Sequence, residues 1–171
     1  MAQDSLQRRV EQLEVYDLAG NMLGVQPRDQ FYAEVRQQYI KEGKTTRKVK
    51  SVMALIASSR GGVYSTRRSD IREENAGLWD KTVGGHVHTN TSYNNTLVTE
   101  FSDELDISTV IAEESEFDVL ISSTDLEAKA VLKKVAYDPN FLSERRNKDG
   151  TFFTTRFMVT FYFGYYDGRV G

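Results

Sequence analysis

The chain has 171 residues, of which 39% are hydrophobic and 27% are charged, and its formal net charge is −3. This length and composition predict a single globular domain with a hydrophobic core of its own. The slightly negative charge gives no basic surface for nucleic acid. The chain contains no cysteine, which excludes disulfides, thiolate nucleophiles and cysteine-bound zinc.

The N-terminal segment is polar and lacks the apolar core of a signal peptide. No part of the chain approaches the run of about 18 apolar residues that a membrane span needs. We therefore predict a cytoplasmic protein that binds neither membranes nor nucleic acid.

The first third of the chain predicts two helices and a hairpin. Residues 4–13 carry apolar side chains at helical spacing, which predicts a short amphipathic helix. Two extended segments, 13–16 and 22–25, flank a turn-rich connector and predict a β-hairpin. Residues 31–42 again repeat apolar side chains at helical spacing, and Gly43 follows as a C-terminal cap.

The middle of the chain predicts a second hairpin and then a glycine-containing loop that leads into a helix. Residues 48–58 are rich in apolar residues and end in a glycine turn, after which 63–66 resumes an extended pattern. Gly84 and Gly85 then precede a short strand, a polar loop and a helix that ends near Ile107.

That helix carries three carboxylates, Glu100, Asp103 and Glu104, which lie on one face because they are spaced i, i+3 and i+4. The neighbouring stripe is apolar. Like charges at this spacing cost roughly 0.2–0.5 kcal/mol per pair on an exposed helix, so the cluster has no stabilising role by itself. A divalent cation would give it one, since Mg²⁺ and Mn²⁺ prefer carboxylate oxygens.

The segment from the glycine pair to the end of this helix resembles the Nudix hydrolase signature. Read from Gly85, the residues that match the signature are Gly85, Glu100, Phe101, Asp103, Glu104 and Ile107. The segment departs from the signature at Thr91, Thr99 and Asp106, where the family has Glu, Arg and Gly.

The residues before this box resemble the branch of the family that is similar to isopentenyl-diphosphate isomerases. The segment 78–87 looks like the strand and double glycine that precede the box in that branch, and 66–68, Thr-Arg-Arg, looks like its Gln-Arg-Arg strand end. The resemblance covers about residues 13–107.

The resemblance to the family weakens after the box. By family standards, residues 112–150 are an insertion, in which the apolar spacing of 125–136 predicts an extra helix and 145–150 predicts a loop and turn. Residues 151–166 form an aromatic strand. The family normally adds a further strand and a closing helix, so we expect either that the domain, 1–171, is C-terminally incomplete or that other elements cover the exposed face of its core.

Two predictions concern the aromatic residues. Trp79 and the aromatic residues of the last strand are expected to pack in the core or within strands rather than to stack on bases. This strand is expected to be exposed, and it could pair with a second copy to give a homodimer.

The resemblance implies an α+β fold, a Nudix-type α/β/α sandwich with a mixed β-sheet. It also implies a Mg²⁺- or Mn²⁺-dependent hydrolase that cleaves the diphosphate linkage of a nucleoside diphosphate derivative or another organic diphosphate. In this reading Glu100, Asp103 and Glu104 correspond to the metal-ligand and general-base cluster. The metal would activate a water for attack at phosphorus.

Further residues near the box are candidates for the same site. His86 and His88, two apart on a strand, face the same side, and His86 could contact the metal or phosphate. The residues that we expect to contact the diphosphate are Gly84, Gly85, Arg67, Arg68 and Lys81.

Two alternatives remain open. Thr91 and Thr99 replace an ion pair that orders the family's active site, so the activity is expected to be reduced, and a catalytically silent module that binds a ligand or a protein is the first alternative. The second is an isomerase-like enzyme, against which stands the absence of the catalytic cysteine for which those isomerases are known.

Overall fold

The computed structural model describes residues 10–170. Within this range the chain forms three helices and ten strands, in the order β1 (Gln12–Asp17), β2 (Met22–Pro27), α1 (Arg28–Glu42), β3 (Arg47–Ala57), β4 (Val63–Tyr64), β5 (Thr66–Arg67), β6 (Trp79–Asp80), β7 (Val83–His86), α2 (Tyr93–Leu105), β8 (Ser108–Ala112), α3 (Phe117–Ser123), β9 (Lys129–Arg146) and β10 (Phe152–Tyr165).

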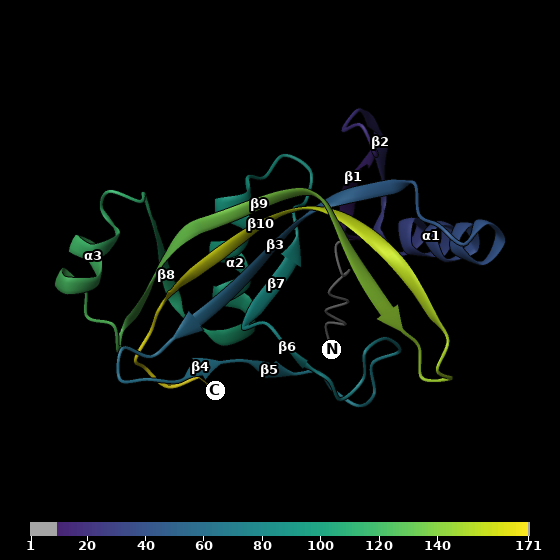
Figure 1. Cartoon of the computed structure of the whole chain (residues 1–171). Helices are drawn as coiled ribbons and strands as arrows, with labels where there is room; N and C mark the ends of the chain where they lie inside the picture. Colours follow the sequence, from purple (N-terminus) through teal and green to yellow (C-terminus); the bar gives the residue numbers. More distant parts are fainter. Residues whose placement is uncertain (1–9, 171) are drawn as a thin grey trace, which may run out of the picture.

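Eight of these strands form one mixed sheet. Its main path is β2-β1-β3-β10-β9-β8, and β4 and β7 also pair with β3, while β5 and β6 form a separate two-stranded sheet. Strand β3 runs parallel to β10 and β8 runs parallel to β9, whereas the other pairs are antiparallel. In Figure 1, β9 and β10 arch across the whole molecule, with α1 beside one end and α3 beside the other. The predicted α+β class with a mixed sheet is confirmed.

The two longer helices cover opposite faces of this sheet. Along β3, Val52 and Ile56 pack in the cluster that contains α2, whereas Val49 and Met53 pack in the cluster that contains α1. Successive residues of a strand face opposite sides, so the odd and even positions mark two faces. The predicted α/β/α sandwich is therefore confirmed, and each face has a buried core of its own.

Local sequence signals correctly located most elements before residue 112. The first hairpin, α1, β3 with β4, and α2 all form where the sequence predicts them. Gly43 adopts the left-handed conformation with a φ of 67°, and its N–H donates to the Tyr39 carbonyl at 2.8 Å. Glycine favours this geometry because it has no Cβ.

The predicted helix over 125–136 is wrong, because β9 occupies most of that range and continues to Arg146. Three consecutive residues, Ala130, Val131 and Leu132, are fully buried because α3 and the main core cover opposite faces of the strand. A strand buried on both sides reads as a continuous apolar run, and such a run also fits a helix.

The predicted loop over 145–150 is also too long, since the turn that joins β9 to β10 lies at residues 147–150. Pro139 lies inside β9, at a register shift where the ladder passes from Phe141 to Asp138. A bulge tolerates proline because the missing N–H is not needed for pairing there. Whether 112–150 is an insertion relative to the family stays a prediction.

Three further expectations change. Gln12 and Leu13 belong to β1 and not to a helix, while residues 4–9 of that predicted helix lie outside the described residues. The edge that was expected to pair with a second copy is not free, because β10 is hydrogen-bonded to β3 on one side and β9 on the other. Trp79 is 72% exposed and does not pack in the core.

None of the helices in residues 10–170 combines the length and the apolar character that crossing a membrane would require.

Candidate functional site

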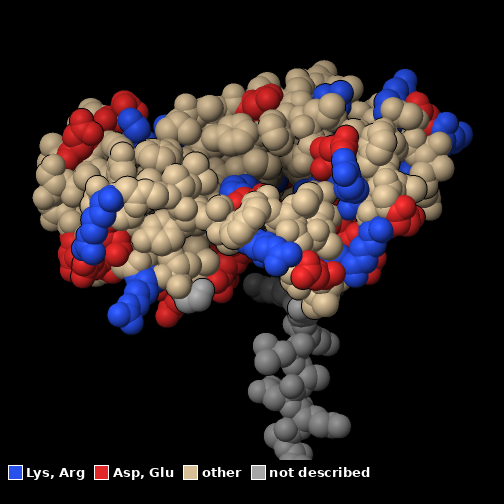
Figure 2. Space-filling view, turned by 60° about the horizontal axis from the view of Figure 1, so that its bottom comes forward, with Lys and Arg blue, Asp and Glu red and all other residues tan. Residues whose placement is uncertain are grey.

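A cavity of about 660 Å³ lies beside the edge strand β7. Its walls come from segments far apart in the chain: the residue before β1, helix α1, strands β3, β7, β9 and β10, helix α2, and the loops between β5 and β6, between β6 and β7, and after β7. Figure 2 shows a recess near the centre of this side of the molecule, with acidic and basic side chains close together in it. Six basic and five acidic side chains line the cavity, so it suits a polar, charged ligand.

The glycine pair is needed because two side chains lie directly over it. A Cβ at Gly85 would collide with the Glu100 carboxylate, and a Cβ at Gly84 would collide with the Lys81 side chain. Because both positions are glycine, Glu100 and Lys81 can lie against the backbone of β7 and enter the cavity from opposite faces of that strand.

The carboxylates of α2 are arranged along the cavity. Glu100 is half-buried and Glu104, one turn later, is exposed at the rim, and both line the cavity. Burial raises the pKa of Glu100 to about 7, and the nearby charge of Glu104 adds to this effect. Burial also raises the pKa of Glu104, against the opposing charges of Lys81 and Arg72.

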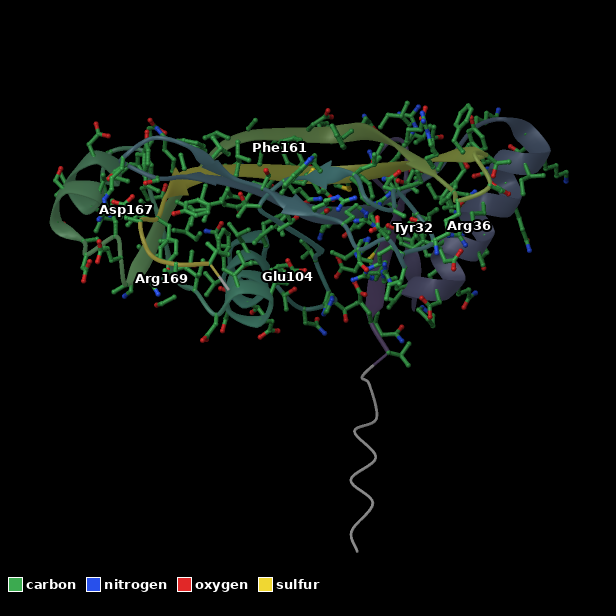
Figure 3. All side chains as sticks on the ribbon, turned by 90° about the horizontal axis from the view of Figure 1, so that it is seen from below. Tyr32, Arg36, Glu104, Phe161, Asp167 and Arg169 are labelled. Carbon is green, nitrogen blue, oxygen red and sulfur yellow. The ribbon has the colours of Figure 1, made fainter. Side chains whose placement is uncertain are left out.

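Asp103 lies apart from these two groups. It is exposed and does not line the cavity. Within residues 10–170, no three Asp, Glu or His side chains converge closely enough to hold one metal ion. Figure 3 places Glu104 on α2, at some distance from Tyr32 and Arg36 on α1.

The loop before α2 is ordered by hydroxyl groups. The Ser92 hydroxyl caps the helix by accepting from the Asn95 N–H at 3.1 Å, and the Thr91 hydroxyl donates to the His88 carbonyl at 2.8 Å. At the other end Asp106 takes the left-handed conformation with a φ of 53°. Thr99 is exposed. The neutral Thr91 side chain therefore helps to order the loop, whereas Thr99 lies in α2 and faces solvent.

Of the three predicted diphosphate-binding cations, two lie at the cavity. Lys81 and Arg68 both line it and share Asp80 as a partner, at 3.0 and 3.4 Å. Arg67 does not line the cavity, because its guanidinium donates to the Gly77 carbonyl at 3.0 Å and pairs with Asp70 at 3.6 Å.

His86 has protein partners on both ring nitrogens. Its Nδ1 lies 3.0 Å from a Glu11 carboxylate oxygen and its Nε2 lies 2.8 Å from the Tyr32 hydroxyl. Burial lowers the pKa of His86, so the neutral ring donates to Glu11 and accepts from Tyr32. His88 contacts the same Glu11 oxygen at 3.3 Å. In this arrangement neither nitrogen of His86 is free to bind a metal ion.

Sequence reasoning missed several residues that line the cavity, which are Glu11, Tyr32, Arg36, Glu74 and Arg145. None of them belongs to the box or to another local motif. They reach the cavity only through strand pairing and helix packing, so no spacing in the sequence indicates them. The charged Glu11, which precedes the first apolar strand, is the one weak signal.

Comparisons with known proteins support the fold. No family model matches the chain, and no curated protein matches it. Among solved structures, DR0079 from Deinococcus radiodurans is similar over 94% of this chain and 75% of its own, with 16% identity and a TM-score of 0.56. The fold is of the Nudix type. A MutT protein from Methanosarcina mazei Go1 is also similar, with 20% identity over 71% of this chain and 66% of its own and a TM-score of 0.44.

Proposed function

We propose that this protein is a metal-dependent Nudix-type hydrolase that cleaves the diphosphate linkage of an organic diphosphate. The observation that carries the proposal is the packing of Glu100 against Gly85, which places this carboxylate and Glu104 in a cavity that Lys81 and Arg68 also line. The match to the Nudix signature includes Gly85 and both glutamates.

The carboxylates present fit a hard divalent cation. Glu100 and Glu104 lie one turn apart in the same cavity, and the folded protein opposes the ionisation of both. Mg²⁺ accepts one or two protein carboxylates and completes its shell with water and substrate oxygens. We therefore propose Glu100 and Glu104 as the ligands, and leave out Asp103 and His86.

Within this site the side chains have separate tasks. Lys81 and Arg68 would contact the diphosphate oxygens, and Asp80 holds both of these cations in place. A bound Mg²⁺ or Mn²⁺ would neutralise charge on the diphosphate and lower the pKa of an attacking water. In the metal-free cavity Glu100 keeps a proton more readily than an ordinary glutamate, and a bound cation would favour its ionised form.

The test is to incubate the protein with a panel of organic diphosphates and Mg²⁺ or Mn²⁺. Turnover is measured as the release of phosphate or monophosphate. Glu104→Gln and Glu100→Gln are each expected to lower kcat/KM by at least about 100-fold, the scale of removing a charge-stabilising group from an active site. Glu127→Gln is the matched control, since Glu127 is exposed and pairs with Arg60 away from the cavity. Equal turnover in all four proteins would refute the proposal.

The second candidate is a silent module that binds a diphosphate without cleaving it. It is favoured by one observation, that no three ligand side chains converge in the described part of the chain. Binding of a non-hydrolysable diphosphate analogue, with no turnover under any metal, would support this reading. Asp103→Asn tests the choice of ligands within the hydrolase model, and it is expected to leave turnover unchanged because Asp103 is exposed and does not line the cavity.

A further inference from the structure

A group of charges on the α1 side of the cavity is not used by the proposed hydrolysis. Arg36 of α1 and Arg145 of β9 both line the cavity, and Glu74, from the loop between β5 and β6, lies between them. One Glu74 oxygen pairs with Arg36, while the other lies 3.9 Å from Arg145. One carboxylate therefore faces two guanidinium groups, which leaves an excess positive charge.

Arg145 is the less satisfied of the two arginines. Its side chain is only 18% exposed, and its Nε is buried with no acceptor. The carboxylate that pairs with Arg145, that of Glu74, lies 3.9 Å from its Nη1, which exceeds hydrogen-bond length. A guanidinium has five N–H donors, and burying a charge without partners is costly.

Aromatic rings hold both guanidinium groups in place. The Arg145 guanidinium carbon lies 5.7 Å from the centre of the Phe157 ring, and that of Arg36 lies 5.0 Å from the centre of the Phe153 ring. Such stacking fixes the plane of a guanidinium while leaving its N–H groups available for an oxyanion. Figure 3 shows Arg36 next to Tyr32, one turn earlier on α1.

Three of the other cations at the cavity lie closer to a carboxylate than Arg145 does, and the fourth, Arg72, is exposed. Arg28 pairs with Glu11 at 3.3 Å, and Arg68 and Lys81 share Asp80. Arg68 also donates to the Glu74 carbonyl at 3.1 and 3.2 Å, which ties this group of charges to the residues proposed to hold the diphosphate. A ligand that contacts both the Arg36–Arg145 pair and the Arg68–Lys81 pair needs two separate anionic groups.

We propose that Arg36 and Arg145 form a second anion-binding subsite, which takes an oxyanion, a phosphate or a carboxylate, of the ligand. Combined with the proposed function, on which this step rests, the subsite defines the substrate class. The substrate is an organic diphosphate whose organic part carries a further acidic group. The subsite itself does not depend on hydrolysis or on metal, so it can be tested alone.

The test is calorimetric titration of the metal-free protein with inorganic phosphate and, separately, with acetate. Arg145→Gln is expected to lower the affinity for the bound anion at least tenfold. Arg146→Gln is the matched control, because it removes the same charge from the neighbouring residue, whose side chain is 66% exposed and faces the other side of β9. The affinity of the Arg146→Gln variant for the anion is expected to stay within twofold of that of the original protein.

The two anions distinguish the sources of the oxyanion. Tighter binding of phosphate than of acetate assigns a phosphate group to the subsite, and the reverse order assigns a carboxylate. If Arg145→Gln does not fold, as judged by urea denaturation, Arg36→Gln decides in its place. The proposal is overturned if the original protein binds neither anion. It is also overturned if Lys81→Gln abolishes binding while the arginine variants do not.

A second measurement links the subsite to the substrate. With Mg²⁺, Arg145→Gln is expected to lower kcat/KM for adenosine 3′-phosphate 5′-diphosphate at least tenfold more than it lowers kcat/KM for ADP. An equal loss for both substrates would refute the substrate class while leaving the anion subsite intact. If the original protein hydrolyses neither these compounds nor any other member of the diphosphate panel, the proposed function fails and the titrations still decide the subsite.

Discussion

Glu100→Gln tests the electrostatics of the cavity through stability, without any assumption about turnover. Burial and the charge of Glu104 raise the pKa of Glu100 from 4.5 to about 7 in the folded protein. At about 1.4 kcal/mol per pKa unit, ionised Glu100 costs the metal-free fold at most about 3 kcal/mol. The stabilisation by the neutral carboxyl is complete below pH 4.5 and is lost as the pH rises through about 7.

The glutamine variant cannot ionise at this position, so it is expected to keep the stability that the original protein loses. Urea denaturation in the presence of a chelator, at intervals from about pH 4.5 to 8.5, measures this difference directly. The curves should agree in acid and separate by up to about 3 kcal/mol in base, with the variant more stable. Glu127→Gln is the control and should follow the original protein. Parallel curves for Glu100→Gln and the original protein would refute the reasoning.

Three other substitutions test the packing. Gly85→Ala displaces the Glu100 carboxylate and is expected to lower diphosphate hydrolysis at least tenfold; unchanged hydrolysis in the folded variant would contradict this. Lys48→Met removes an ammonium group that donates to the Leu18 carbonyl at 3.0 Å and to two further acceptors at 2.8 Å. It should lower the free energy of unfolding, measured by urea denaturation, by roughly 2 kcal/mol. An unchanged denaturation midpoint would show that the acceptors find other partners. Gly164→Ala places a Cβ against backbone atoms of β9 and should cost about 1–3 kcal/mol in the same assay, and a smaller loss would mean that β9 can shift.

Most elements up to residue 107 could be predicted because their signals are local. The cap at Gly43, the turn between β1 and β2, and the apolar stripe of α2 each depend on residues close in sequence. Strand β9 could not be predicted in the same way. Its burial on both faces depends on α3 and on the distant β10, and its proline lies at a bulge that only the pairing defines.

The residues of the candidate site also fall into those that local sequence places and those that distant strand pairing places. Residues within the box, Glu100, Glu104 and Gly85, share the cavity as the signature suggests, because one strand, one loop and one helix place them. Arg145 and Glu11 come from outside the box, and the sheet brings them there. Arg67 fails to reach the cavity for a local reason, since Asp70 and the Gly77 carbonyl hold its side chain on the surface.

The parallel pairing of β3 with β10 also constrains how the protein folds. Ten consecutive residue pairs join Lys48–Ala57 to Arg156–Tyr165, so the two central strands of the sheet are separated by most of the chain. Closing so long a loop costs entropy before the pairing repays it, and domains rich in such contacts fold slowly. During synthesis, the sheet cannot be completed until β10 has left the ribosome, because β10 is the last of its strands in the sequence. Until then β3 and β9 each lack the strand that joins them, and unpaired strand edges of this kind favour aggregation.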